Sequence, residues 1–164
     1  MKEIIRLDGI HRNFVVGGET VHALRGVSFT INEGEFVTIM GTSGSGKSTL
    51  LNILGCLDTP TSGSYFIDGA EVQAPQLRYV TVFQNYGLLP WRTVESNIEL
   101  GLESKNVPKE ARPAIIDKYV KMVGLDHARN RNPAELSGGM QQRVSIARAL
   151  AVDPDIIFMD EPLG

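Results

Sequence analysis

The residues with the clearest chemical purpose lie between Gly41 and Ser48. This stretch, Gly-Thr-Ser-Gly-Ser-Gly-Lys-Ser, fits the pattern G-x-x-x-x-G-K-[ST] at every fixed position. Its glycines allow the backbone to curl so that successive N–H groups point at an anion, and a helix starting near Lys47 adds the positive end of its dipole. The Lys47 ammonium can reach nucleotide β- and γ-phosphates, and the Ser48 hydroxyl can ligate Mg²⁺. We name residues 41–48 the phosphate loop; a chance Gly/Ser-rich loop is the alternative.

A second chemical group lies near the other end of the sequence. Residues 156–159 are an apolar run that predicts a strand, and Asp160 and Glu161 follow it directly. At the carboxyl edge of a parallel sheet such groups face the ligand crevice, where Asp160 suits Mg²⁺ and Glu161 suits polarising an attacking water. Alone, this pattern is as typical of a strand that ends in a solvated acidic turn as it is of a catalytic site. Together with the phosphate loop it favours the catalytic interpretation.

The elements that must position these groups follow from the pattern of apolar residues. Residues 36–40, directly before the phosphate loop, are an almost wholly apolar and β-rich run, which predicts a strand covered on both faces in a parallel sheet. Pro113 is expected either in the first turn of its helix or as a break. The order of elements predicts an α/β fold with a helical insertion. The other expected strands are 4–7, 20–24, 27–31, 64–67 and 79–83, and the expected helices are 47–57, 93–101, 108–123 and 138–151.

Composition narrows the function classes. A chain of 164 residues with 42% hydrophobic residues and a net charge of −3 fits one soluble domain, and it lacks the basic excess typical of nucleic-acid binding. No apolar run approaches the roughly 18 residues of a membrane-spanning helix, and the N-terminus has no apolar signal core. The single cysteine, Cys56, is expected to be a small buried core residue, and the lack of paired cysteines favours a reducing compartment.

A third motif lies between the phosphate loop and the acidic strand. Residues 136–143 read Leu-Ser-Gly-Gly-Met-Gln-Gln-Arg. Ser137 suits the N-cap of a helix here, but capping alone does not explain the whole octet. With the phosphate loop before it and Asp160-Glu161 after it, the chain resembles an ABC-transporter nucleotide-binding domain over residues 4–164. We name residues 136–143 the signature motif.

The resemblance implies a fold and a division of the chain. The implied fold is an ABC-type P-loop NTPase core sheet with an N-terminal antiparallel β portion and a helical insertion, incomplete at the C-terminus. Residues 1–164 would be a single nucleotide-binding domain. Within it, residues 1–84 would be the β-rich ATP-binding core, 85–145 the helical subdomain with the signature motif, and 146–164 the return to the core.

The same resemblance implies ATP and Mg²⁺ as ligands and gives roles to matching residues. Phe14 lies where an aromatic ring stacks on adenine, with a core role as the alternative. Gln84 matches a glutamine that senses Mg²⁺ or the attacking water, with a plain loop residue as the alternative. The implied catalytic residues are Glu161, Lys47 and Gln84. The implied nucleotide contacts are Phe14, Gly41, Ser43, Gly44, Ser45, Gly46, Lys47, Ser48, Thr49, Ser137, Gly138 and Gly139, and the implied Mg²⁺ ligands are Ser48, Gln84 and Asp160.

Partners also follow from the resemblance. Two such domains pair head to tail, so that Ser137 and Gly139 of one would contact the γ-phosphate held by the other. A transmembrane permease would contact the region around Gln84–Trp91, where Leu88-Leu89-Pro90-Trp91 suggests an exposed apolar docking surface. The implied function is an ATPase that drives solute transport through a separate permease, in the cytoplasm at the inner face of the membrane.

The sequence departs from the family pattern in ways that leave alternatives open. It ends at Gly164, before an Ala-Leu-Asp element and a switch histidine, so a module that binds ATP without turnover is the alternative function. The strand that follows in the family sheet is also absent, so residues 36–40 are expected to pair directly with residues 156–159 or to expose an apolar edge.

Subfamily resemblance changes along the chain. Residues up to about 68 resemble lipoprotein-release and macrolide exporters, and residues from about 82 resemble nitrate, sulfonate and taurine importers. This leaves the direction of transport open and is compatible with a truncated, recombined or engineered chain. A DNA-repair or chromosome-structure ATPase is disfavoured, because only about ninety residues separate the two motifs and they carry no sustained heptads.

Overall fold

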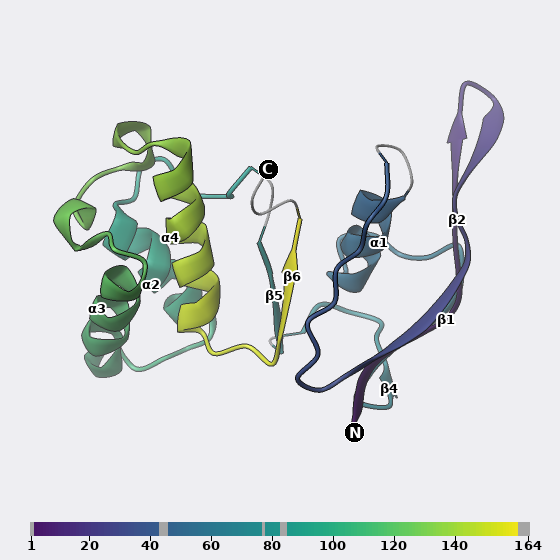
Figure 1. The fold of residues 1–164 in the computed structure, drawn as a ribbon, viewed down its shortest axis with the longest axis horizontal. Coiled ribbons are helices and arrows are strands. Elements are labelled where there is room, and N and C mark those ends of the chain that lie inside the picture. The colour runs from purple at the N-terminus through teal and green to yellow at the C-terminus, as the bar shows by residue number, and fades with distance from the viewer. Residues whose placement is uncertain (1, 43–45, 77, 83–84, 161–164) are drawn as a thin grey trace. The chain divides into compact units, whose positions relative to one another are not determined.

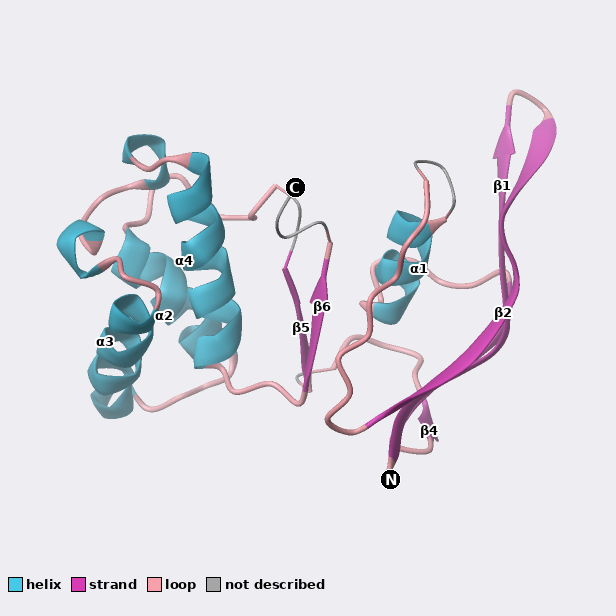
Figure 2. Cartoon of the chain, viewed as in Figure 1, coloured by secondary structure: helices cyan, strands magenta, loops and turns pink. Residues whose placement is uncertain are grey.

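The computed structural model describes residues 2–42, 46–76, 78–82 and 85–160. The chain divides into two compact units, Met1–Gln76 and Leu77–Gly164. In the ribbon the first unit consists mainly of strands with one helix, and the second consists of helices with a pair of strands (Figure 2).

A long antiparallel hairpin dominates the first unit (Figure 1). Strands β1 (Glu3–Val16) and β2 (Glu19–Asn32) pair along their length, and the turn between them is Gly17-Gly18 with φ of 59° and 81°. Two residues at positive φ are what a tight hairpin turn of right-handed twist requires. The predicted strands at 20–24 and 27–31 are therefore one strand, because Gly26 (φ 84°) forms an irregularity in the ladder that bends β2 without ending it.

One helix packs on the sheet that this hairpin begins. The strand order is β2-β1-β3-β4, with β3 at Ser62–Ile67 and β4 at Ala70–Glu71, all antiparallel. Helix α1 (Lys47–Leu54) buries Leu50, Ile53 and Leu54, and the Tyr65 hydroxyl donates to the Leu54 carbonyl at 2.8 Å. The end of α1 is thus fixed to β3. The sheet contributes Ile5, Leu7, Ile10, Leu24, Tyr65 and Ile67 to the core.

The prediction of a buried parallel strand at residues 36–40 is wrong. These residues form no strand, and Phe36 and Met40 are 94% and 86% exposed. Because residues 36–40 form no strand, the expected pairing with residues 156–159 is wrong as well, and the alternative expectation of exposed apolar residues holds. A strand exists only through hydrogen bonds to a neighbour, and residues 36–40 have no ladder partner in the described part of the chain. Apolar composition alone therefore did not suffice to bury them.

Two smaller corrections concern the end of α1. The helix ends at Leu54, three residues before the predicted end at 57. Cys56 has a φ of 58°, which a continuing right-handed helix cannot accommodate, and the N–H of Gly55 closes the last turn on the Leu51 carbonyl. Cys56 is half-buried rather than the buried core residue that we predicted.

The second unit has a helical bundle and a two-stranded parallel ladder. Strand β5 (Tyr79–Val82) pairs with β6 (Ile156–Met159), whose bounds match the prediction. Helix α4 (Gly138–Ala151) also matches its predicted range, and α2 runs over Val94–Ser104. The predicted helix at 108–123 is divided into a short turn, η1 (Lys109–Ala111), and α3 (Arg112–Met122), with Pro113 in the first turn of α3. Two further short 3-10 turns are η2 (Asp126–Ala128) and η3 (Pro133–Glu135).

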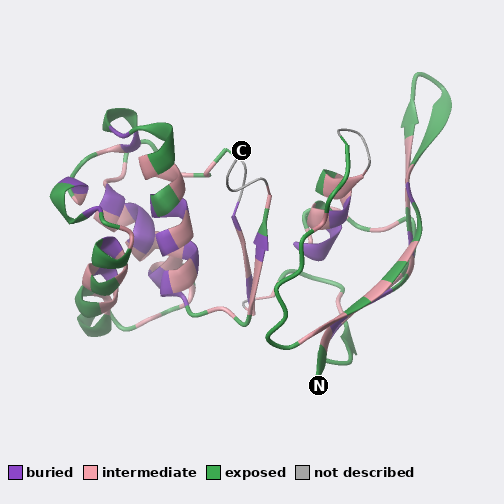
Figure 3. Cartoon of the chain, in the orientation of Figure 1, coloured by how far each residue is buried: buried purple, intermediate pink, exposed green. Residues whose placement is uncertain are grey.

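A single apolar cluster lies between the three long helices of this unit. Figure 3 shows the buried residues on the facing sides of the helices. Gly101 of α2 permits close contact with α4, because an added Cβ would lie 3.1 Å from Cγ1 of Val152 and 3.3 Å from the Arg148 carbonyl oxygen. The cluster comprises Val94, Ile98, Leu102, Ile116, Val120, Leu125, Ala128, Leu136, Val144, Ala147, Ala151 and Val152.

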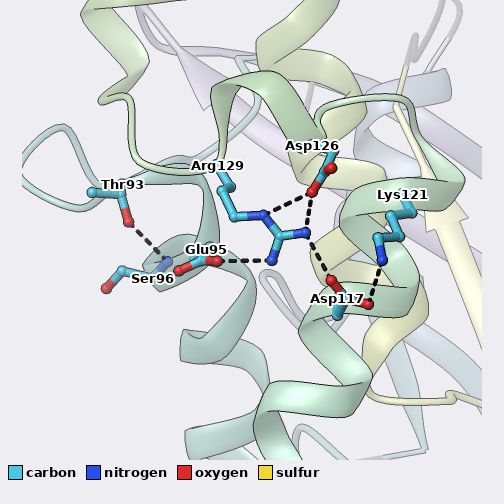
Figure 4. A network of polar contacts seen from close by, with 7 residues as sticks. All are labelled: Thr93, Glu95, Ser96, Asp117, Lys121, Asp126 and Arg129. Carbon is cyan, nitrogen blue, oxygen red and sulfur yellow. Dashed lines mark hydrogen bonds and ion pairs between the residues drawn. The ribbon is translucent and has the colours of Figure 1, made fainter.

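Arg129 links three elements of the bundle electrostatically (Figure 4). Its guanidinium contacts Glu95 of α2 at 3.0 Å, Asp117 of α3 at 2.8 Å, and Asp126 of η2. The Lys121 ammonium also contacts the Asp117 carboxylate, at 3.0 Å. Hydrogen bonds from Lys121, which has the larger effect, and from Arg129 lower the pKa of Asp117. The Asp117, Asp126 and Glu95 carboxylates raise the pKa of Arg129 above its usual value. This network fixes the first turn of α2 against α3.

Candidate functional site

The phosphate loop leads into helix α1 in the first unit. Gly46 is the N-cap of α1, with a φ of 93°, and the Leu50 N–H donates to its carbonyl at 2.9 Å. A Cβ on Gly46 would lie 2.7 Å from the Ala23 carbonyl oxygen of β2. Glycine is therefore required here twice, by the backbone conformation and by the close approach to β2.

The first turn of α1 is open to an external ligand. No side chain caps it in the part of the loop that the structure describes, so its N–H groups keep the capacity to bind an anion. Lys47 and Thr49 are half-buried, whereas Ser48 and Gly41 are exposed. The predicted contacts Ser43, Gly44 and Ser45 lie outside the described residues.

Phe14 lies on the same hairpin that contacts Gly46. It pairs with Val21 of β2. Val21 is two residues before Ala23, where β2 contacts the start of α1, so about one two-residue repeat of the strand separates Phe14 from that contact. The Phe14 side chain is half-buried, and the guanidinium carbon of Arg12 lies 4.1 Å from the centre of its ring. Phe14 thus lies on the hairpin close to the point where β2 contacts the start of α1.

Arg12 is a residue that the sequence did not single out. Its Nε and Nη2 donate to the Asp58 carboxylate at 2.8 and 3.2 Å, and Nη1 donates to the Asn13 carbonyl at 2.8 Å. The hydrogen bond from Arg12 lowers the pKa of Asp58 below its ordinary value; partial burial opposes this effect, and the Thr59 N–H adds to it. The signal that was available, an arginine two positions before an aromatic residue, does not reveal a partner 46 residues away.

The signature motif forms the start of α4 in the second unit. Ser137 is the N-cap, and its hydroxyl accepts from the Met140 N–H at 3.2 Å, which confirms the predicted capping role. Ser137, Gly138 and Gly139 are all exposed. The Gln141 side-chain amide donates to the carbonyls of Pro133 at 3.0 Å and Leu136 at 3.4 Å, which fixes the approach to the helix. The motif is therefore preformed and accessible.

Arg148 connects α4 to the segment that follows Gln84. Its guanidinium donates to the carbonyls of Gly87 at 2.9 Å and Tyr86 at 3.1 Å, and burial lowers its pKa. Tyr86 and Gly87 both have positive φ, 66° and 64°. Gln84 itself lies outside the described residues. Sequence reasoning missed Arg148, because an arginine between two alanines does not reveal a backbone partner 62 residues away.

A buried asparagine shapes the loop that was predicted as a docking surface. Asn97 is completely buried; its Oδ1 accepts from the Leu89 N–H at 2.9 Å, and its Nδ2 lies 3.0–3.2 Å from three carbonyl oxygens. Those carbonyls belong to Leu89, Arg92 and Thr93. Trp91 is 73% exposed, whereas Leu88 packs partly against the helical core. Only part of the predicted apolar segment is therefore accessible.

Asp160 follows β6 as predicted. Its N–H donates to the Val82 carbonyl of β5 at 3.0 Å, which places it at the carboxyl edge of the parallel pair. Glu161 lies outside the described residues. The residues that the structure describes include no cluster of three or more His, Cys, Asp or Glu side chains able to hold a metal, and no described helix is long and apolar enough to cross a bilayer.

Comparison with known proteins agrees with this arrangement. The family model described as ABC transporter matches residues 24–164. An uncharacterized ABC transporter ATP-binding protein of Methanocaldococcus jannaschii is 48% identical over all of this chain, which spans 61% of that protein. A bicarbonate transport ATP-binding protein of Synechococcus elongatus is 44% identical over all of this chain, which spans 25% of that protein.

Solved structures show the same relationship. A dimeric ATP-binding cassette in a post-hydrolysis state, bound to ADP and Pi, superposes with a TM-score of 0.90 and 41% identity over 98% of this chain and 75% of that one. The match extends to both units of the chain. With its glycine-required phosphate loop and its preformed signature motif, the chain therefore belongs to the ABC transporter family, has the mixed α/β fold of its cassettes, and is an ATP-binding domain of that family.

Proposed function

We propose that this chain binds Mg-ATP at the start of α1 and, in the full protein, hydrolyses it to drive solute transport. The observation that carries the proposal is the uncapped first turn of α1, held against β2 by Gly46. Backbone N–H groups of the phosphate loop would bind the phosphates, with Lys47 contacting the β- and γ-phosphates and Thr49 adding its hydroxyl. The Ser48 hydroxyl, which is exposed, would hold Mg²⁺ together with Asp160 and Gln84.

Further contacts complete the proposed site. Phe14, whose ring is half-buried, would stack on the adenine. Glu161 would act as the general base toward water, a role that suits a carboxylate directly after the acidic strand. Mg²⁺ supplies charge neutralisation at the phosphates when it is bound. The donor set of hydroxyl, amide and carboxylate oxygens is the type that Mg²⁺ prefers.

The proposed partners are a second copy of the domain and a permease. A dimeric neighbour at TM-score 0.90 supports head-to-tail pairing, in which Ser137, Gly138 and Gly139 of one copy would contact the γ-phosphate bound by the other. The exposed Trp91, in the proposed helical subdomain of residues 85–145, supports a permease contact around Gln84–Trp91. Relatives named for bicarbonate transport and nitrate import favour an importer working at the cytoplasmic face of a membrane.

The test is calorimetric titration of the chain with Mg-ATP. We expect saturable binding, and we expect Lys47→Ala to weaken it at least about 30-fold, because a charge-assisted contact to phosphate is lost. Lys109→Ala, which removes an exposed lysine from the second unit, is the matched control and is expected to bind normally. Absence of any heat at millimolar Mg-ATP would reject the proposal.

A parallel assay separates binding from turnover. Phosphate release by the wild-type chain supports the hydrolytic function, whereas binding without release supports a module that holds ATP without turning it over. Light scattering of Glu161→Gln in excess Mg-ATP tests the head-to-tail dimer. A species that stays monomeric there would contradict the proposed pairing.

A further inference from the structure

We propose that Arg12 is a positioning residue for the nucleotide base, which covers one face of the Phe14 ring and leaves the other face for the base. The inference deepens the proposed function and rests on it, since it assumes that Phe14 stacks on adenine. Its structural basis is the guanidinium of Arg12, whose central carbon lies 4.1 Å from the centre of the Phe14 ring. This distance is well within the range of a cation–π contact.

The Arg12 guanidinium is fixed by its own hydrogen bonds. Two of its nitrogens donate to the Asp58 carboxylate at 2.8 and 3.2 Å, and the third donates to the Asn13 carbonyl at 2.8 Å. The side chains of Arg12 and Asp58 are only 24% and 26% exposed. A planar cation held by three acceptors has little freedom, so the ring that it covers is held in one orientation.

The surroundings of Phe14 provide little other support for its ring. The neighbouring apolar side chains near the hairpin tip are exposed, with Val15 at 76%, Val16 at 64% and the paired Val21 at 48%. Arg12, in contrast, is a described contact of the ring face. Because a cation on one face withdraws electron density from the ring, the opposite face suits stacking against an electron-rich purine.

The same ion pair links the hairpin to the phosphate-loop helix. Asp58 lies four residues after the end of α1 at Leu54, and its neighbour Thr61 donates its N–H to the His11 carbonyl at 2.8 Å. The Thr61 hydroxyl in turn accepts from the Asn13 N–H at 2.9 Å. These contacts all lie within the first unit, so they hold Phe14 in a fixed relation to the helix that begins at the phosphate loop.

The experiment compares two ligands that differ only in having a nucleoside. Calorimetry gives the Kd of Mg-ATP and of Mg-tripolyphosphate for the wild type, Arg12→Gln and Arg25→Gln. Arg25→Gln is the matched control, because Arg25 is an exposed arginine on the neighbouring strand, opposite His11. We expect Arg12→Gln to weaken Mg-ATP binding about threefold to fivefold and to leave tripolyphosphate binding unchanged, as loss of a cation–π contact predicts.

Two further variants test whether Arg12 acts through the ring. Phe14→Leu is expected to weaken Mg-ATP binding alone, and adding Arg12→Gln to it is expected to cause no further loss. Arg12→Lys keeps the cation but loses the fork to Asp58, so we expect a partial loss; it also replaces Arg12→Gln if circular dichroism shows that variant unfolded.

Each outcome separates the inference from the function on which it rests. Equal weakening of both ligands by Arg12→Gln, or a full additional loss in the Phe14→Leu background, would show that Arg12 acts on phosphate charge or on folding, and overturns the inference alone. Normal Mg-ATP binding by Phe14→Leu would instead reject the proposed stacking of Phe14 on adenine. Failure of the wild type to bind either ligand would reject the nucleotide site as a whole.

Discussion

Helices α1 and α4 both begin at a glycine-rich motif, yet their first turns differ in construction. The N-cap of α1 is Gly46, at a φ of 93° and with no side-chain cap, and an added Cβ there would lie 2.7 Å from a carbonyl oxygen of β2. The N-cap of α4 is Ser137, at a φ of −66°, whose hydroxyl accepts from the Met140 N–H. Gly139, in the first turn of α4, has no heavy atom within 4 Å of an added Cβ.

The difference indicates how each helix start would meet an anion. The start of α1 is sterically fixed by a neighbouring strand, while its N–H groups have no described side-chain acceptor, so it is preorganised for an external ligand. The start of α4 is sterically open at Gly139, and the Ser137 hydroxyl already accepts a hydrogen bond from one N–H group of the first turn. An anion at α4 must therefore compete with Ser137 or share the helix end with it.

The largest expected effect comes from placing the same substitution at both helix starts. Gly46→Ala introduces a Cβ against β2 at a positive φ, and we expect it to lower the free energy of unfolding by about 3 kcal/mol or more. Gly139→Ala adds a helix-favouring residue in open space, and we expect it to raise stability by up to about 0.5–1 kcal/mol. Urea denaturation followed by circular dichroism measures both values. Equal effects at the two positions would remove the structural distinction between the two helix starts.

A smaller effect is expected at the cap of α4. Ser137→Ala removes the hydroxyl that accepts from the Met140 N–H, so we expect a loss of about 1 kcal/mol in the free energy of unfolding without nucleotide. Ser137→Asp keeps a capping oxygen and is the matched control, with stability expected near that of the wild type. Urea denaturation of the two variants is the measurement. If Ser137→Ala were as stable as the wild type, the self-capped description of α4 would be incorrect.

The same two helices show how far the sequence predicts the fold. The range of α4 was predicted correctly, and its start has a local signal in the capping residue Ser137. The start of α1 was also predicted from the phosphate loop, but its end was not. Cys56 has a positive φ that cysteine rarely adopts, so the residue type gives no signal that the helix ends there. Local chemistry thus predicts helix starts better than ends imposed by the surrounding chain.

Long-range contacts explain the remaining misses. Residues 36–40 have the composition of a central strand, but a strand also needs neighbours, and composition does not specify where they lie. Arg12 and Asp58 are 46 residues apart, and Arg148 and Tyr86 are 62 apart. Residue types and spacing predicted the phosphate-loop contacts and the acidic pair, and the family resemblance implied the other ligand contacts, whereas the side chains that hold those contacts in place required the folded structure.

The smallest expected effect concerns the other end of α1, where Asp58 binds Arg12. Because that contact lowers the pKa of Asp58 in the folded state, the stability it contributes is fully present above the unfolded pKa of about 4. It is lost as the pH falls from there through the lower folded pKa, since protonation removes the ion pair. At pH 6 we expect Asp58→Asn to cost about 0.5–1 kcal/mol in the free energy of unfolding, and at pH 2 to cost almost nothing.

Urea denaturation at the two pH values measures this difference, with Glu33→Gln, an exposed carboxylate of the same unit, as the control for losing one negative charge. The control separates the loss of one negative charge from the loss of the contact with Arg12 at each pH. The Ser137→Ala loss at α4 involves a neutral hydroxyl and is expected to be the same at both pH values. An Asp58→Asn cost that stayed constant between pH 6 and pH 2 would mean that the carboxylate charge does not hold α1 to the hairpin, which would leave contacts such as the Tyr65 hydrogen bond and the buried apolar face of α1.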